Sequence, residues 1–297
     1  MIIIDSIKQS IVLKGKINNE DYCEIKNLEK ICAERDKVSF KLELEYKLNI
    51  LNKLDYEAIN LNDFMFYDSE TLIGYIGMND FGGDTFEVNG MVHPDYRNKG
   101  IFTRLFSLVQ DEWKKRLQQE MLLLCDNKSI SGIEFIKKVT DYYDHSEYDM
   151  VLNMEAIPRL SCHNIILRNA KSCEAKRIAE MDSLLFDMDA KEDDELIKKN
   201  IENGTTFIAE TNNTDIGKVR LEINDSVGGI YGLGVLPEFR GKGYGRELLL
   251  LSVDKLKEMG CVKIILQVEV NNRNALNLYK SCGFEENYVM DYYKMKK

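Results

Sequence analysis

The chain has 297 residues, of which 44% are hydrophobic and three are proline, so it can bury two ordinary cores. Its formal net charge is -10, and no basic patch interleaved with aromatic residues is present, which argues against nucleic acid as a partner. Its seven cysteines include no Cys-x-x-Cys pair, so neither a disulfide framework nor a zinc site is expected, and the adjacent Cys162 and His163 are not expected to bind metal.

The apolar segments are too short for a membrane span or a signal peptide. Ile2 to Ile4 are followed at once by Asp5, and no apolar run approaches eighteen residues, so we expect a cytoplasmic protein without a membrane partner. The acidity lies almost entirely in residues 1–157, which carry 19 basic and 28 acidic side chains. An acidic surface suits a cationic amine substrate, and it equally suits simple solubility.

The first half of the chain alternates helical and strand patterns. Charged amphipathic patterns predict helices over 19–36 and 39–54. Strands are predicted over 70–78 and 86–92, with a turn over 81–84, followed by a helix over 101–117, a strand over 121–125 and a helix over 131–139.

The second half repeats this α/β order after a linker over 157–163, where Pro158 interrupts regular structure. The predicted elements are a strand over 164–168, helices over 173–186 and 193–203, and strands over 205–211, 217–223, 229–236 and 262–268. We therefore predict two α/β domains, 1–157 and 164–297.

A glycine-rich turn follows the predicted strand that ends near Val235. Its sequence is Arg240-Gly241-Lys242-Gly243-Tyr244-Gly245, and the apolar run 248–251 continues it as a helix. The helix would present free backbone N–H groups and its positive dipole end to an anion, and the glycines let the backbone approach phosphate oxygens closely. A Walker loop and a dinucleotide fingerprint both require other spacings.

A weaker copy of this loop lies earlier in the chain. The segment 92–102 aligns with 235–245, a shift of 143 positions, and each follows a strand pattern and precedes a helical one. A repeat of this length indicates tandem domains and not a solenoid.

A second motif lies downstream of the loop, beginning at Asn272. On a helix Ala275, Leu278, Tyr279 and Cys282 share one face, so Tyr279 points inward. An inward tyrosine in such a stripe is most often a packed core residue.

Together, the loop and the downstream motif closely resemble the GNAT N-acetyltransferase superfamily, over about residues 164–297 and more loosely over the first half. The resemblance implies two tandem GNAT-like domains, each with a mixed, strongly twisted sheet flanked by helices. It implies direct transfer of the acetyl group from acetyl-CoA, without a metal, to a primary amine on a small molecule or peptide. The strand before the loop would be bulged, opening a slot for pantetheine. The implied acetyl-CoA-binding residues are Val235, Arg240, Gly241, Lys242, Gly243, Tyr244, Gly245 and Asn272.

Within this resemblance, Tyr279 is the catalytic candidate, because the family places a tyrosine there to protonate the departing thiolate. The base is unassigned: no glutamate occupies 230–234, and Glu222 and Glu269 are either bases acting through water or surface carboxylates. Tyr288, Tyr292 and Tyr293 alternate on a predicted closing strand, and they either line an acceptor pocket or pack in the core.

The N-terminal copy lacks several of these features, so we expect a degenerate scaffold domain. Phe102 stands where the other loop has Gly245, and would crowd the phosphate; Asn98 replaces Gly241, and Ile136 replaces Tyr279. Glu87 nevertheless lies where family members often keep a base. The alternative function is a non-catalytic acyl-CoA-binding or sensing protein. The sequence indicates neither the acceptor nor the oligomeric state.

Overall fold

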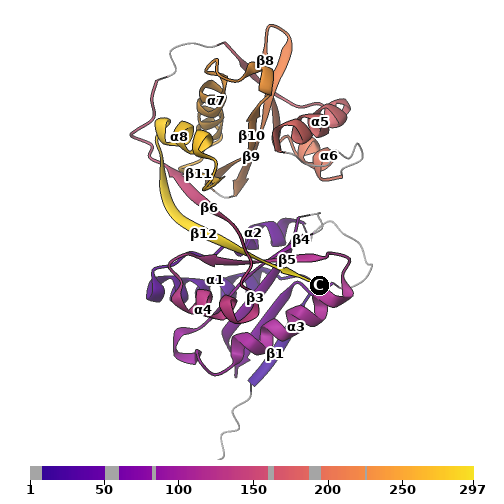
Figure 1. The fold of residues 1–297 in the computed structure, drawn as a ribbon, viewed down its shortest axis with the longest axis vertical. Coiled ribbons are helices and arrows are strands. Elements are labelled where there is room, and N and C mark those ends of the chain that lie inside the picture. The colour runs from indigo at the N-terminus through magenta and orange to yellow at the C-terminus, as the bar shows by residue number, and fades with distance from the viewer. Residues whose placement is uncertain (1–8, 51–59, 82–84, 160–163, 187–194, 225) are drawn as a thin grey trace, which may run out of the picture. The chain divides into compact units, whose positions relative to one another are not determined.

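The computed structural model describes residues 9–50, 60–81, 85–159, 164–186, 195–224 and 226–297, with the side chains of 49 and 50 left aside. Backbone contacts divide the chain into two compact units (Figure 1). The first unit comprises Met1–Ser146 and Tyr288–Lys297, and the second comprises Glu147–Asn287.

The first unit is a mixed sheet with helices on both faces. In chain order it contains β1 (Gln9–Lys14), α1 (Asn19–Asp36), α2 (Leu44–Ile50), β2 (Asp63–Asp68), β3 (Thr71–Asp80), β4 (Thr85–Val92), α3 (Ile101–Lys115), β5 (Glu120–Asp126), α4 (Ile130–Val139), the start of β6 (Tyr143–Leu152) and most of β12 (Phe284–Lys296). The sheet order is β1-β2-β3-β4-β5-β12, and only β4 and β5 are parallel. Along β2 the alternation is clear: Phe64 and Phe66 face the core under α3, and Met65 faces the core under α1.

The second unit repeats this layout. It contains the rest of β6, then β7 (Ile166–Asn169), α5 (Ala175–Phe186), α6 (Glu195–Glu202), β8 (Thr206–Thr211), β9 (Thr214–Asn224), β10 (Val227–Val235), α7 (Tyr244–Glu258), β11 (Lys263–Glu269) and α8 (Arg273–Ser281). The sheet order is β6-β11-β10-β9-β8-β7, with β10 and β11 parallel. Helices α5 and α7 both contact β9 and β10, one on each face of the sheet. The predicted fold class, two tandem α/β domains with mixed sheets, is confirmed.

Most predicted elements are present, with shifts of a few residues at their ends. The helix predicted over 19–36 is confirmed at both ends: Asn18 caps its start through a reciprocal pair of hydrogen bonds with Asp21, and it ends at the C-cap Lys37, which has a φ of 57°. The helix predicted over 39–54 is observed only as α2, and residues 51–54 of it lie outside the described residues, as does most of the turn predicted over 81–84. Three strands were not predicted: β1, β2 and β6.

The two units exchange their last strands, which the sequence did not indicate. Residues 290–296 of β12 pair with β5 of the first unit, and residues 147–151 of β6 pair with β11 of the second. Contacts thus assign 288–297 to the first unit and 147–157 to the second, whereas the sequence places the division at 157–164. The exchange is anchored by Tyr292, which is 1% exposed and accepts a 2.7 Å hydrogen bond from Lys41 Nζ.

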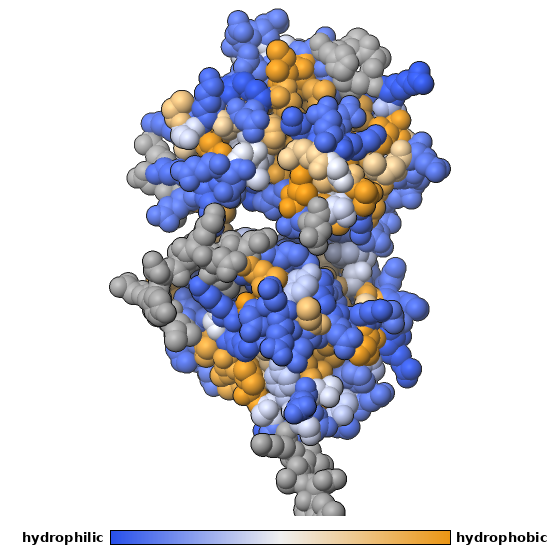
Figure 2. Space-filling model, turned by 180° about the vertical axis from the view of Figure 1, so that it is seen from behind, coloured by the Kyte–Doolittle hydropathy of each residue, from blue (hydrophilic) through white to orange (hydrophobic). Residues whose placement is uncertain are grey.

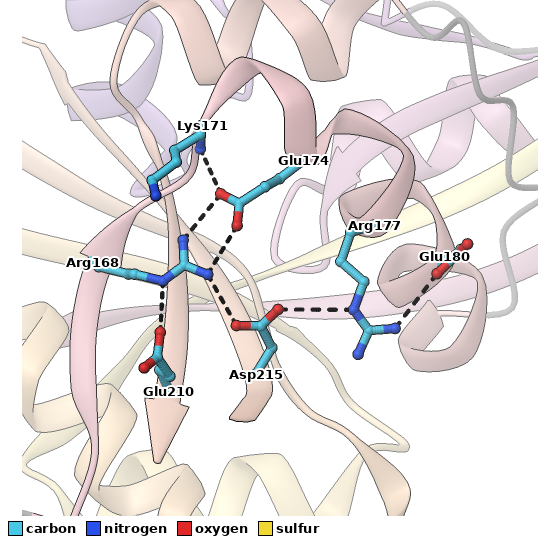
Figure 3. Close-up of polar contacts among 7 residues, drawn as sticks. All are labelled: Arg168, Lys171, Glu174, Arg177, Glu180, Glu210 and Asp215. Carbon is cyan, nitrogen blue, oxygen red and sulfur yellow. Dashed lines mark hydrogen bonds and ion pairs between the residues drawn. The ribbon is translucent and has the colours of Figure 1, made fainter. Parts of the chain in front are cut away.

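An ion-pair cluster joins β7 to its neighbours in the second unit (Figure 3). The Arg168 guanidinium reaches Glu174, Glu210 and Asp215 at 2.8 to 3.0 Å. Asp215 also lies 3.9 Å from Arg177. Hydrogen bonds from Arg168 to these carboxylates raise its pKa and lower that of Glu174. Since Arg168 connects β7, β8, β9 and the turn before α5, we interpret this cluster as structural.

The surface seen in Figure 2 is largely hydrophilic, with smaller groups of hydrophobic residues between the polar ones. Among the described residues, no helix combines the length and hydropathy needed to cross a membrane.

Candidate active site

The glycine-rich loop of the second unit connects the end of β10 to the first turn of α7. Gly241 and Gly243 have φ angles of 75° and 87°, in the left-handed region that glycine tolerates best. No described atom lies within 4 Å of the position that a Cβ would take at either glycine. The loop therefore faces open space on the side where an anion would bind.

The backbone N–H groups of residues 241–245 have no hydrogen-bond acceptor among the described residues. Five consecutive unpaired donors at the start of a 15-residue helix form a concavity of the kind that suits an anion. Arg240 and Lys242 support the loop itself: Arg240 Nε donates to the Val235 carbonyl at 2.9 Å, and Lys242 Nζ donates to the Glu238 carbonyl at 3.1 Å.

A gap opens between β10 and β11 just before this loop. Their parallel pairing ends at Ile230, and β10 shifts register against β9 between Tyr231 and Gly234. The bulge expected in the strand before the loop is thus confirmed. Because the Leu236 N–H donates to β9, at Ile216, the preceding Val235 N–H points away from β9 and toward the gap.

Tyr279 lies on α8 and is 9% exposed. Burial raises the pKa of its hydroxyl, which has no hydrogen-bond partner among the described residues. The side chain packs in the main core of the unit, 6.2 Å from Phe284 between ring centroids. The structure confirms its inward orientation; its role as an acid stays a prediction.

The Asn272 side chain caps α8, accepting a 3.1 Å hydrogen bond from the Ala275 N–H. Its use as an N-cap accounts for the residue type without a ligand. Gly245 lacks the positive φ of Gly241 and Gly243, and a Cβ there would lie at an ordinary contact distance, 3.5 Å, from Leu278, so its backbone does not require glycine.

The surroundings of Glu222 and Glu269 single out neither residue as the base. Glu222 pairs with Arg220 at 3.0 Å on β9, and Glu269 is exposed at the end of β11. By register, the residue opposite Glu222 is Gly229, whereas Glu87 in the first unit stands opposite Asn79. The bulge therefore moves the counterpart of Glu87 by one position, and that counterpart is a glycine.

Sequence reasoning missed one ionisable residue beside the bulge, Lys218 on β9. Its side chain is 9% exposed and forms an ion pair with Asp182 of α5. Lys218 alternates with Val219 in a run that continues with Arg220 and Glu222, the pattern of a strand with one polar face, so the sequence carried no signal that this lysine is buried.

The loop of the first unit has nearly the same backbone. Gly100 has a φ of 78° and Asn98 a φ of 60°, so asparagine adopts the left-handed conformation that Gly241 has. Arg97 Nε donates to the Val92 carbonyl at 3.0 Å, as Arg240 does to Val235. The Phe102 ring packs 4.6 Å from Phe135 of α4 between centroids.

A cavity of about 690 Å³ lies in the first unit between this loop, β4, β5 and α4. Asn89 lines it, is 5% exposed, and its Nδ2 has no partner among the described residues. Ile136 also lines the cavity, at the position corresponding to Tyr279, and Glu87 lies 3.4 Å from Lys41.

No group of three or more metal-ligating side chains occurs among the described residues. Cys162 and His163 fall outside them.

The model of the acetyltransferase (GNAT) family matches this chain twice, over residues 25–139 and 175–284. Mycothiol acetyltransferase of Thermomonospora curvata is 37% identical over 86 residues, which are 29% of this chain and 29% of that protein. Mycothiol acetyltransferase of Thermobifida fusca is 41% identical over 61 residues, 20% of this chain and 19% of that protein. The chain thus matches less than a third of the length of either.

Two solved structures share the fold across nearly the whole chain. A GCN5-related N-acetyltransferase from Sphaerobacter thermophilus has a TM-score of 0.77 at 17% identity, covering 96% of this chain and 95% of that one. A tandem GNAT protein from the clavulanic acid biosynthesis pathway has a TM-score of 0.70 at 14% identity, covering 97% and 98%. At these identities the similarity concerns the fold.

Proposed function

We propose that this chain, which belongs to the acetyltransferase (GNAT) family because the family model matches most of its residues, transfers an acetyl group from acetyl-CoA to a primary amine. Acetyl-CoA as cosubstrate follows from the family. The acceptor is proposed only as an amine on a small molecule or peptide, since the matches to mycothiol acetyltransferases cover less than a third of their length.

The second unit is the proposed catalytic unit, because it combines five unpaired loop N–H groups with the gap between β10 and β11 and the inward Tyr279. They would bind the pyrophosphate of acetyl-CoA, with Gly241 and Gly243 permitting close approach. The pantetheine would then enter the gap beyond Ile230, where β10 and β11 no longer pair.

In that gap the Val235 N–H would donate to the thioester carbonyl and stabilise the oxyanion, an interaction worth about 3 kcal/mol. Direct attack by an amine held beside the thioester forms the amide bond as the carbon–sulfur bond breaks. Tyr279, whose pKa burial raises further above the ordinary 10.0, would give its proton to the leaving thiolate.

A second acyl-CoA site in the first unit is the alternative that a specific observation favours. The cavity of about 690 Å³ adjoins a loop with the same free donors, and the Phe102 ring packs on Phe135. In this alternative the first unit senses acyl-CoA, since Ile136 supplies no proton for the thiolate.

Release of free thiol from acetyl-CoA, measured across a panel of primary amines, tests the function. Amine-dependent release that disappears on substitution of Gly243 supports transfer at the second unit. Binding of acetyl-CoA without release in the presence of any amine would instead identify an acyl-CoA-binding protein.

A further inference from the structure

Lys218 is a buried lysine on the central strand β9, on the face of the sheet that α5 covers. Its ammonium pairs with the Asp182 carboxylate, and these side chains are 9% and 17% exposed. Lysine is rarely buried unless its charge is matched. Asp182 therefore explains why the buried charge is tolerated, but it does not explain why a lysine occupies this position.

The pair lies at the bulge that opens the proposed acetyl-CoA gap. Lys218 is the register partner of Gly234, the residue before Val235. Its Nζ atom lies 3.9 Å from the position that a Cβ would take at Gly232, an exposed residue inside the bulge with a φ of 52°. The ammonium is therefore beside the strand segment whose end supplies the proposed oxyanion donor.

Side chains of α5 complete this surface. A Cβ at Gly234 would meet Leu185 at 2.7 Å, and Phe186 lies 4.0 Å from the corresponding position at Gly232. The Phe186 ring is 5.9 Å from Lys218 Nζ. With glycine at 232 and 234, the bulge has room beside it for apolar side chains of α5 and for the ion pair between Lys218 and Asp182.

We propose that Lys218, poised by Asp182, accepts the proton of the acceptor amine in the C-terminal site. The inference rests on the proposed function and supplies the base that the glutamates of this unit do not. It places the acceptor amine on the side of β10 that α5 covers.

The charges facing Lys218 come from two elements. Burial lowers its pKa from the ordinary 10.5, the nearby positive charge of Arg220 on β9 lowers it further, and Asp182 of α5 opposes both. Arg220 is itself paired with Glu222 and lies over the Tyr231 ring. The net effect increases the neutral, proton-accepting fraction of Lys218.

Each turnover removes two protons from the acceptor nitrogen. The acceptor ammonium gives one proton to neutral Lys218, which releases it to solvent beside Asp182. The free amine attacks the thioester carbon, and the carbon–sulfur bond breaks while Tyr279 protonates sulfur. Nitrogen then gives its second proton to Lys218, which again releases it to solvent, and the Tyr279 phenolate takes one proton back from solvent. One proton is released overall, together with amide and CoA thiol.

A purely structural ion pair predicts different behaviour from a base. Lys218→Arg keeps the positive charge and the pairing with Asp182, but arginine does not deprotonate in proteins. Lys218→Met keeps the length and removes the charge. If Lys218 is the base, both variants should lower kcat by about 100-fold and leave the acetyl-CoA dissociation constant within twofold of the wild type.

The decisive readouts are the pH profile and chemical rescue. Wild-type kcat should rise with pH to a plateau, with an apparent pKa below 10.5. This rise should be absent from the variants. Trimethylamine, which has no N–H to acetylate, should restore turnover of Lys218→Met in proportion to its concentration. Lys255→Met is the matched control, because Lys255 forms an exposed ion pair with Glu258 in the same unit.

Turnover of Lys218→Arg within twofold of wild type overturns the proposal. If Lys218→Met fails to fold, as its melting curve would show, the wild-type profile decides: a flat kcat between pH 6 and 10 also overturns it. Failure of the wild-type protein to release thiol with any amine would reject the proposed function itself, a separate result.

Discussion

The loops after β4 and β10 are nearly superimposable in their internal bonding, yet the strands that lead into them differ. Gly100 and Gly243 have φ angles of 78° and 87°, and an arginine in each loop donates to the last strand carbonyl. β10 is bulged between Tyr231 and Gly234, whereas β4 pairs with β3 in continuous register. The loop conformation is therefore present in the first unit without the bulge that accompanies it in the second.

The side chains beside the two loops also differ. Tyr279 has its counterpart in Ile136, and Lys218 has its counterpart in Tyr75, whose hydroxyl bonds to Asp63 in a fully buried cluster with Lys47. The first unit has Glu87 where the second has a glycine. The second unit thus contains the proposed acid and a lysine beside a bulge. The first unit contains a cavity and a carboxylate instead.

The largest expected effect is a loss of stability in the first unit. Tyr292→Ala removes a ring that is 1% exposed and the hydroxyl that Lys41 bonds, so it should lower the free energy of unfolding of the first unit by about 3 to 5 kcal/mol. Acetyl-CoA binding at the second unit should persist. Chemical denaturation and calorimetry measure both, with Tyr142→Ala, at a 56% exposed position, as control. If Tyr142→Ala lowers the free energy of unfolding equally, the exchanged strand has no special role in stability.

That exchange marks the limit of what the sequence predicts. The 143-residue repeat, the loop and the periodicity of α1 follow from local patterns, because turn glycines, caps and apolar faces act over a few residues. Which strand pairs with β5 is decided by contacts between residues such as Lys41 and Tyr292, far apart in the chain. Lys218 was missed for a similar reason: its partner Asp182 lies on another element.

The second prediction tests the chemical difference between Tyr279 and Ile136. Tyr279→Phe keeps the packed ring and removes the proton donor, so kcat should fall by about 100-fold while acetyl-CoA affinity and melting temperature stay unchanged. Steady-state kinetics with calorimetry separate these effects, and Tyr142→Phe is the control. Wild-type turnover by Tyr279→Phe would mean that the two units do not differ through this hydroxyl.

The third prediction compares the loops themselves. Valine at Gly243 or at Gly100 places a β-branched residue at positive φ, which costs about 1 to 2 kcal/mol in either loop. If the second unit is the principal site, Gly243→Val should weaken acetyl-CoA binding about tenfold or more, and Gly100→Val should change it less than twofold. Titration calorimetry on both variants gives the ranking. The reverse ranking would move the cofactor to the cavity of the first unit.

The smallest expected effect concerns the Arg168 cluster, which plays no part in the difference between the two loops. Arg168→Met removes ion pairs to Glu174, Glu210 and Asp215, but the arginine is 26% exposed and solvent screens such pairs. Loss of about 1 kcal/mol from the second unit is expected, with kcat unchanged because the cluster joins β7 to β8, β9 and the turn before α5. The effect should shrink in high salt, since screening weakens the pairs in the wild type as well. Denaturation at low and high ionic strength measures this, with Lys255→Met as a matched loss of one exposed pair. A fall in kcat without a fall in stability would show that this cluster acts on the site and not on the fold.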